Sequence, residues 1–320
     1  MAKPSKFMLL AFSVSMFVGL GCRSAPITGR KQVLLVEERE EMGLGLASYQ
    51  QILQEEPLSQ NQQFVEIVNR VGQRIATVAE RPDYQWEFRV IASGQANAFA
   101  LPGGKVAVYE GILPICESEA GLAVVMAHEI AHVLARHGGE RMSHGYIKDA
   151  AGTFFKYATR TLDEQKRQLA DQAFGTASRY GVMLPYSRKH ESEADKIGLL
   201  LMAKAGYDPA EAPRFWQRFA ASSSDHQPLE FFSTHPADGR RASDLFELLP
   251  EAQQLYYQAM PQWGRGEMLN LPGVAFHPPT VGEDRFSSPP RQPTTSTAFA
   301  PQAGILRPTQ AGPSSPGAMR

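Results

Sequence analysis

Three ionisable side chains interrupt an apolar run between Leu122 and Leu134. His128, Glu129 and His132 form the pattern H-E-x-x-H, with apolar residues on both sides. The run is long enough for a helix, and burying polar groups in an apolar helix costs free energy unless each has a partner. Any fold of this chain therefore has to bring partners for these groups to that helix.

A metal ion is one such partner. Two histidines four residues apart lie on one helical face, where both imidazoles can hold a single Zn²⁺ at about 2.0–2.1 Å. Glu129 lies at the rim of that face and can reach a metal-bound water without ligating the ion. The chain has only two cysteines, so the ligands would have to be histidines and carboxylates. The alternative is a pair of core histidines satisfied by hydrogen bonds.

A catalytic zinc ion also needs a third protein ligand. The run E-S-E-A-D supplies a candidate, because Glu191 and Asp195 are four residues apart and share one helical face. One of them can ligate while the other hydrogen-bonds the far nitrogen of a ligand histidine. Glu193 is two positions along and faces elsewhere. In isolation, such a run is more typical of a solvated acidic helix start.

The periodicity of apolar residues predicts an α+β fold. Helices are expected over residues 36–54 and 61–79, from about 118 to a stop at 138–139, from about 187 to 206, and in short pieces to about 258. Strands are expected over residues 86–91, 97–101 and 106–109, which we interpret as a small antiparallel sheet. Residues 141–181 are weakly patterned, and a mobile lid is one hypothesis for them.

The N-terminal 22 residues are typical of an export signal. Lys3 and Lys6 precede an apolar stretch over residues 7–20, which is shorter than the roughly 20 residues that span a bilayer. The stretch ends at Gly21 and Cys22, which resemble the bacterial lipobox and predict lipidation of Cys22. Arg23 after the cysteine favours an outer-membrane anchor over an inner-membrane one. The alternative is a permanent single-span anchor.

Composition separates the remaining chain into two parts. Residues 23–265 form the expected folded domain, and residues 266–320 are rich in proline and small polar residues, which predicts a disordered tail. A proline-motif ligand is the alternative for that tail. The formal net charge of −1 gives no reason to expect nucleic acid as a partner.

Four segments in order resemble the zinc metallopeptidase family M48. They are NAFALPGGKVAVYEGIL, HEIAHVLARH, LPYSRKHESEAD and STHPADGRR, and the resemblance runs from about residue 26 to about residue 249. It implies a zincin-like (gluzincin) fold that is mostly helical with a small antiparallel sheet. It also implies one zinc ion per chain, with His128, His132 and Glu191 as ligands and Glu129 as catalytic base. Asp195 would be the partner of a ligand histidine.

The resemblance implies further site residues. His235 would either sit on the zinc and hold the enzyme inactive or turn toward the substrate, and Arg241, with Arg240 as competitor, would act beside it. An ordinary loop histidine is the alternative for His235. Asn97 and Ala98 would lie on an edge strand that pairs with an extended substrate.

The remaining histidines and Cys116 are expected to be bystanders. His137 ends the zinc helix, where a cation suits the helix dipole, and Cys116 is expected to be a small buried hydrophobe. The other histidines lack ligand spacing and are expected at the surface or behind the ligands: His144, His190, His226 and His277.

The function expected from these features is that of a zinc-dependent endopeptidase of the bacterial cell envelope. It would degrade misfolded or unassembled envelope proteins and reach the membrane through a lipid anchor, as a periplasm-facing lipoprotein of the outer membrane. Zinc and Glu129 would activate water, and His235 or Arg241 would stabilise the oxyanion. The alternative is a zinc-containing holdase or assembly factor for outer-membrane proteins with rare, gated proteolysis.

Overall fold

The computed structural model describes residues 22–159, 184–222, 231, 235 and 240–269. All of them belong to one compact unit, residues 1–279, and the second unit, residues 280–320, lies outside the described residues. The expected signal before Cys22, most of the expected tail, much of the expected lid, His226 and His277 also lie outside them. Within the described ranges, no helix is both long and apolar enough to cross a membrane.

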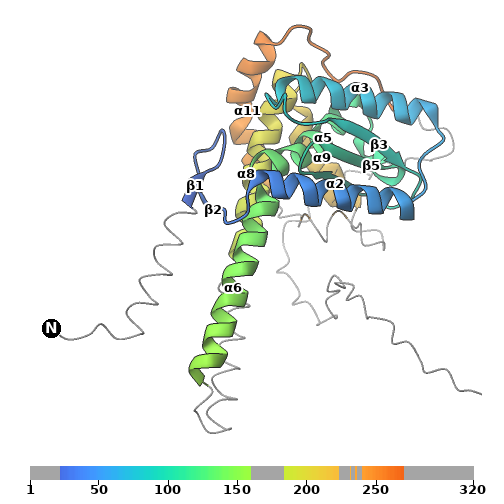
Figure 1. Ribbon diagram of the computed structural model, residues 1–320. Coiled ribbons are helices and arrows are strands. Elements are labelled where there is room, and N and C mark those ends of the chain that lie inside the picture. Colours follow the sequence, from blue (N-terminus) through green and yellow to red (C-terminus); the bar gives the residue numbers. More distant parts are fainter. Residues whose placement is uncertain (1–21, 160–183, 223–230, 232–234, 236–239, 270–320) are drawn as a thin grey trace, which may run out of the picture. The chain divides into compact units, whose positions relative to one another are not determined.

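A three-stranded sheet lies beside the helix that carries H-E-x-x-H (Figure 1). Its strands are β3 (Glu87–Ile91), β4 (Ala98–Leu101) and β5 (Lys105–Tyr109), in the order β3-β5-β4. β4 pairs antiparallel with β5, but β3 pairs parallel with it, so the expectation of an all-antiparallel sheet is wrong. The periodicity within a strand reports which side chains are buried and carries no information about the direction of its partner.

The two faces of the sheet are covered by different helices. Val106 and Val108 of β5 pack into the main core with α3 (Gln62–Val78), whereas Ala107 and Tyr109 pack against α2 (Glu38–Glu55). This alternation is the two-residue period of a strand buried on both faces. It explains why all five residues of β5 are buried.

The central helix, α5 (Glu119–Leu134), buries every residue except the partly buried His132. Its N-terminus follows the prediction: Ser118 is the N-cap, and its hydroxyl accepts a hydrogen bond from the Gly121 N–H at 3.2 Å. The predicted end is wrong, because the chain turns at Arg136, which has φ +57°, and α6 (His137–Thr159) begins directly after it.

Two short helical segments, η1 (Glu110–Ile112) and α4 (Leu113–Cys116), lead into α5, and Cys116 is buried as expected. Three longer helices follow: α8 (Leu184–Lys204), α9 (Glu211–Ser222) and α11 (Arg241–Gln258). α8 packs along α5, and α11 packs on α8 (Figure 1).

Two segments from the ends of the described chain also contact this core. Strands β1 (Cys22–Ser24) and β2 (Lys31–Val33), which the sequence patterns did not predict, form an antiparallel hairpin. At the other end, the carbonyls of Arg265 and Glu267 accept hydrogen bonds from the first backbone N–H groups of α5 at 3.0 and 2.9 Å. The ordered chain therefore continues past residue 265, where the tail was expected to begin.

Candidate metal centre

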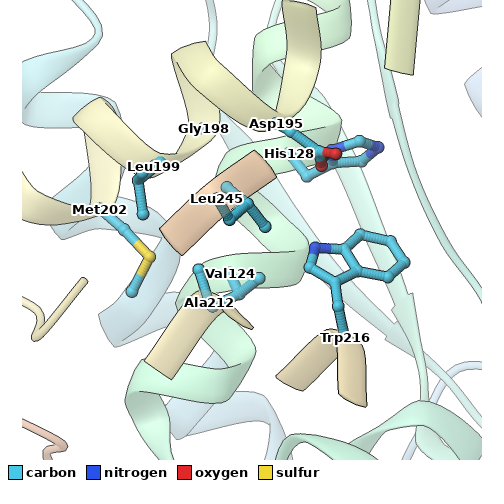
Figure 2. A pocket seen from close by; sticks show the side chains of 9 residues that line it. All are labelled: Val124, His128, Asp195, Gly198, Leu199, Met202, Ala212, Trp216 and Leu245. Atoms are coloured by element: carbon cyan, nitrogen blue, oxygen red, sulfur yellow. The ribbon is translucent and has the colours of Figure 1, made fainter. Parts of the chain in front are cut away.

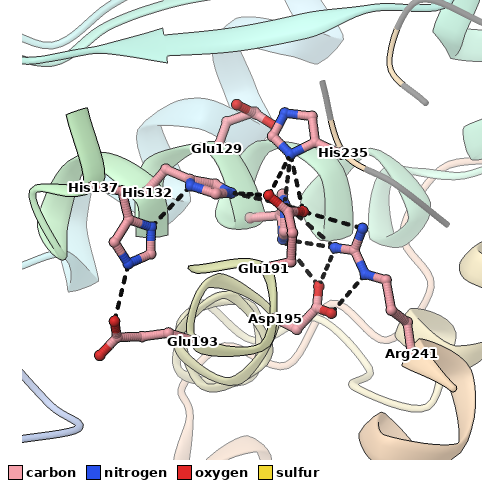
Figure 3. A network of polar contacts seen from close by, with 9 residues as sticks. Glu129, His132, His137, Glu191, Glu193, Asp195, His235 and Arg241 are labelled. Atoms are coloured by element: carbon pink, nitrogen blue, oxygen red, sulfur yellow. Dashed lines mark hydrogen bonds and ion pairs between the residues drawn. The ribbon is translucent and has the colours of Figure 1, made fainter. Parts of the chain in front are cut away.

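Four side chains from three parts of the chain converge on one point (Figure 3). His128 and His132 come from α5, Glu191 comes from α8, and His235 lies between α9 and α11. The His128 Nε2 atom lies 3.1 Å from His132 Nε2 and 3.3 Å from both His235 Nδ1 and a Glu191 carboxylate oxygen. One ligand atom from each of the four lies within 4.8 Å of the others.

These spacings fit a zinc ion. A tetrahedral ion with bonds of about 2.0–2.1 Å holds its ligand atoms roughly 3.3–3.4 Å apart. The distances from His128 to the other three residues, and from Glu191 to His132 and His235, run from 3.1 to 3.4 Å. The donor set of imidazoles and one carboxylate is the set that zinc prefers when thiolates are absent. The residues present therefore fit the ion that the H-E-x-x-H pattern implied.

Asp195 and Arg241 support the ligands from behind. Asp195 Oδ1 lies 3.0 Å from His128 Nδ1, the ring nitrogen that faces away from the cluster. Arg241 donates hydrogen bonds of 2.7 and 2.6 Å to both oxygens of Asp195, and its Nη1 lies 3.2 Å from Glu191 Oε2. The guanidinium stacks over the Trp216 ring, with 3.5 Å between its carbon and the ring centroid. These contacts orient two carboxylates, and the expected role of Arg241 at an oxyanion stays a prediction.

Glu129 is buried on the side of the cluster that faces His235. Its Oε1 atom lies 3.3 Å from His235 Nε2 and is otherwise without a hydrogen-bond partner among the described residues. Burial raises the pKa of Glu129, and the neighbouring histidines only partly oppose this. A carboxylate whose pKa is shifted toward neutrality is suited to accept and return a proton.

An apolar pocket lies behind the ligands (Figure 2). His128 and Asp195 are the only ionisable groups among its lining residues, and Trp216 closes one side. The other lining residues are aliphatic or small: Val124, Gly198, Leu199, Met202, Ala212 and Leu245. This wall keeps water from the rear of the centre, which strengthens the electrostatic attraction between His128 and Asp195.

Asn97 and Ala98 lie where β4 begins. Among the described strands β4 pairs only with β5, so it is an edge strand, and it packs beside α5. The Asn97 carbonyl accepts a hydrogen bond from the Tyr109 N–H at 3.0 Å. The structure thus places these two residues on a sheet edge close to the zinc helix, and their use in substrate binding stays a prediction.

The sequence patterns missed His137, which contacts the ligand His132 from outside the centre. His137 is fully buried and its Nδ1 lies 2.9 Å from His132 Nδ1, while its Nε2 lies 3.0 Å from Glu193 Oε2. Burial lowers the pKa of His137 to about 4, so the expectation of a cation at the helix end is wrong. Helical phase could not reveal this contact, because the turn at Arg136 separates α5 from α6.

Known proteins resemble this chain over the same region. Residues 62–249 match the sequence profile of Peptidase family M48. The mitochondrial metalloendopeptidase OMA1 of Schizosaccharomyces pombe is 44% identical over 58% of this chain and 53% of its own length. OMA1 of Saccharomyces cerevisiae is 31% identical over 79% of this chain and 77% of its own length. The beta-barrel assembly-enhancing protease of Escherichia coli K12 is 28% identical over 69% of this chain and 47% of its own length.

These matches bear on location and on identity. The chain spans only about half the length of the S. pombe and E. coli relatives. Several relatives are named as mitochondrial proteins, which contradicts the outer-membrane location expected from Gly21 and Cys22, and that expectation is wrong. The N-terminal apolar segment shows only how hydrophobic and how long it is, and these properties do not identify the membrane to which a protein goes. The profile covers more than half of the chain and the S. cerevisiae relative is matched over most of its length, so the chain belongs to Peptidase family M48, a family of zinc metallopeptidases.

Proposed function

We propose that this chain is a zinc-dependent endopeptidase that hydrolyses peptide bonds in extended segments of other polypeptides. His128, His132 and Glu191 would hold the zinc ion, and Glu129 would be the general base. The observation that carries this proposal is the convergence of the ligand atoms beside the buried Glu129 carboxylate, whose Oε1 faces His235 and no other polar partner in the described part of the chain.

The side chains of the centre divide the chemistry between them. Zinc, when bound, supplies Lewis acidity toward the scissile carbonyl and the attacking water. Glu129 accepts the proton that the attacking water loses and then donates it to the leaving nitrogen, which its raised pKa favours. Asp195 accepts a hydrogen bond from His128 Nδ1 and so keeps the lone pair of Nε2 directed at the ion.

His235 is the candidate gate of the centre. Its Nδ1 lies 3.1 Å from each carboxylate oxygen of Glu191 and 3.3 Å from His128 Nε2, so it would be a fourth ligand to an ion held by the other three residues. A catalytic zinc needs that position for water or substrate. We therefore infer that His235 holds the centre at rest and has to leave before a peptide can react.

The edge strand β4 supports extended peptides as the substrate class. Backbone N–H and C=O groups on the free side of an edge strand bind another strand whatever its side chains are. Such recognition selects unfolded or unassembled polypeptides, in which a strand-length segment is accessible. We propose proteins that have failed to fold or assemble as the physiological substrates, with Asn97 and Ala98 at the contact.

The variant Glu129→Gln tests this function, because it removes the base and keeps the shape of the side chain. We expect zinc content to stay near one per chain while cleavage of an unfolded substrate such as casein falls by about 10²–10⁴-fold. The exposed Glu66 on α3 offers the matched control, Glu66→Gln, which should cleave like the wild type.

Two results would count against the proposal. Equal cleavage by wild type and by zinc-loaded Glu129→Gln would exclude Glu129 as base. A biological phenotype that Glu129→Gln fully rescues would favour the second candidate, an assembly factor with rare proteolysis. The relative from E. coli, which is named for assembly as well as proteolysis, supports keeping that candidate.

A further inference from the structure

A chain of polar contacts runs from the metal centre to the N-terminal hairpin. It starts at His132, whose Nδ1 lies 2.9 Å from His137 Nδ1, and it continues from His137 Nε2 to Glu193 Oε2 at 3.0 Å (Figure 3). Two residues of the turn between β1 and β2 then hold Glu193: Arg30 Nε donates to Oε2 at 2.5 Å, and the Thr28 hydroxyl donates to Oε1. The contacts of Thr28 and Arg30 with Glu193 join residues more than 100 positions apart in the sequence.

Hydrogen-bond chemistry gives this chain of contacts a direction. A histidine that offers its Nε2 lone pair to a metal carries its proton on Nδ1, so His132 has to donate to His137 Nδ1. His137 Nδ1 is then an acceptor, and its proton sits on Nε2, where it is donated to the Glu193 carboxylate. An ionised Glu193 accepts hydrogen bonds only, so it selects this tautomer of His137.

Arg30 places a positive charge against the buried Glu193 carboxylate. Its guanidinium bridges two carboxylates, with Nε on Glu193 and Nη1 and Nη2 at 3.0 and 2.6 Å from the two oxygens of Glu140. The Thr28 hydroxyl and Arg30 Nε donate to the two oxygens of Glu193, and His137 Nε2 lies 3.0 Å from Oε2. The His137 and His190 rings stack with 4.0 Å between their centroids, and each ring contacts one of the two carboxylates.

We propose that Arg30 and Thr28 are positioning residues for the metal centre. By holding Glu193 they fix the tautomer and orientation of His137, and His137 in turn directs His132 at the ion. This inference rests on the proposed function, because it assumes that His132 is a ligand. Its consequence is that the turn of the N-terminal hairpin controls how tightly the centre binds zinc, so a displacement of the hairpin would weaken the centre.

The test compares zinc affinity among variants of the full chain, measured by competition with a chromophoric chelator at one pH. His137 is the outer partner of His132, and losing such a partner costs about 10- to 100-fold in metal affinity. We expect a loss of up to this size for Arg30→Ala and for Glu193→Ala, because both release His137. Arg30→Lys, which keeps the charge, should recover part of it. The exposed Arg23 of β1 provides the matched control, Arg23→Ala, which should bind like the wild type.

Two further measurements separate positioning from simple unfolding. Thermal unfolding of the metal-free variants reports whether each is folded, and Glu193→Gln, which keeps an oxygen for His137, provides a milder change if Arg30→Ala does not fold. The visible absorption spectrum of the cobalt-substituted protein should shift in Arg30→Ala, since it reports ligand geometry.

The outcomes of these measurements distinguish the two proposals. If the wild type binds no zinc, the proposed function fails. If the wild type binds zinc and folded Arg30→Ala binds it within twofold with an unchanged cobalt spectrum, the positioning role is wrong.

Discussion

His235 approaches the metal centre from a segment that contributes no other described ligand. Its ring contacts the proposed zinc ligand Glu191 through Nδ1 and the proposed base Glu129 through Nε2. A histidine in this place can block the position that water or substrate needs, or it can stabilise the oxyanion after moving. In this structure His235 belongs to the cluster of possible ligand atoms, and its role as a gate stays a prediction.

We expect His235→Ala to raise peptide hydrolysis several-fold, because the substrate no longer displaces a side chain from the fourth position. Zinc content should stay near one per chain, since three protein ligands are enough. Turnover and metal content measured together check this expectation. A tenfold drop in turnover with zinc retained would instead assign His235 to the oxyanion, and zinc loss without any gain in turnover would contradict the gate.

The approach of α8 to α5 brings Glu191 and Asp195 to the histidines. Gly198 allows this approach, because a Cβ at that position would lie 3.0 Å from both the Cα and the backbone N of His128. Backbone atoms of a buried helix cannot move aside cheaply. The spacing between the two helices, and with it the distance from Asp195 to His128, therefore depends on a residue without a side chain.

Gly198→Ala should lower the free energy of unfolding by about 1–3 kcal/mol, the usual cost of overpacking, and should weaken zinc binding. Denaturant unfolding and chelator competition measure the two effects. Gly43 on α2 is the matched control, because nothing lies within 4 Å of the position its Cβ would take. Gly43→Ala should raise stability by about 0.5–1 kcal/mol. If Gly198→Ala changes neither the free energy of unfolding nor zinc affinity, α8 can shift without consequence and the prediction is wrong.

Contacts between distant segments hold the described unit together. Glu140 of α6 is the clearest case: it accepts hydrogen bonds from Arg30 of the hairpin and lies 3.1 Å from His190 of α8. Burial opposes ionisation of Glu140, yet the hydrogen bonds from His190 and Arg30 outweigh it and hold its pKa at about 2. The His144 ring nitrogen Nε2 lies 3.9 Å from Glu140 Oε1.

This lowered pKa predicts a specific acid sensitivity. A carboxylate whose pKa falls from 4.5 to about 2 on folding stabilises the protein above pH 4.5 and loses that contribution as pH falls to 2. The wild type should exceed Glu140→Gln in free energy of unfolding by about 3 kcal/mol at neutral pH, and the difference should shrink across that window. Denaturant unfolding of the metal-free proteins measures it. A difference that does not change with pH would contradict the assignment.

The C-terminal part of the described chain gives a second prediction about long-range contacts. Removing residues 270–320 should leave thermal stability unchanged, since that part is expected to be a tail. Removing residues 260–320 should lower stability by roughly 1–3 kcal/mol, because Glu119 and Ala120 at the start of α5 lose the carbonyls that accept their N–H groups. Thermal unfolding of both truncated chains checks this, and equal stability would refute it.

Local chemistry made much of the centre predictable. A four-residue spacing places two side chains on one face of a helix whatever surrounds it, so His128 with His132, and Glu191 with Asp195, could be paired from the sequence. Capping chemistry is equally local, which is why the start of α5 at Ser118 agrees with the prediction. Resemblance to a known family, rather than spacing, drew attention to His235 and Arg241.

Other features depended on contacts between segments that are distant in the sequence. The parallel pairing of β3 with β5, the turn at Arg136 and the contact from Arg30 to Glu193 leave no periodic signal, because each arises where separate elements meet. Periodicity reports the burial of one element against an unspecified neighbour. The identity of that neighbour, and hence the path from the hairpin to His132, is settled by packing in three dimensions.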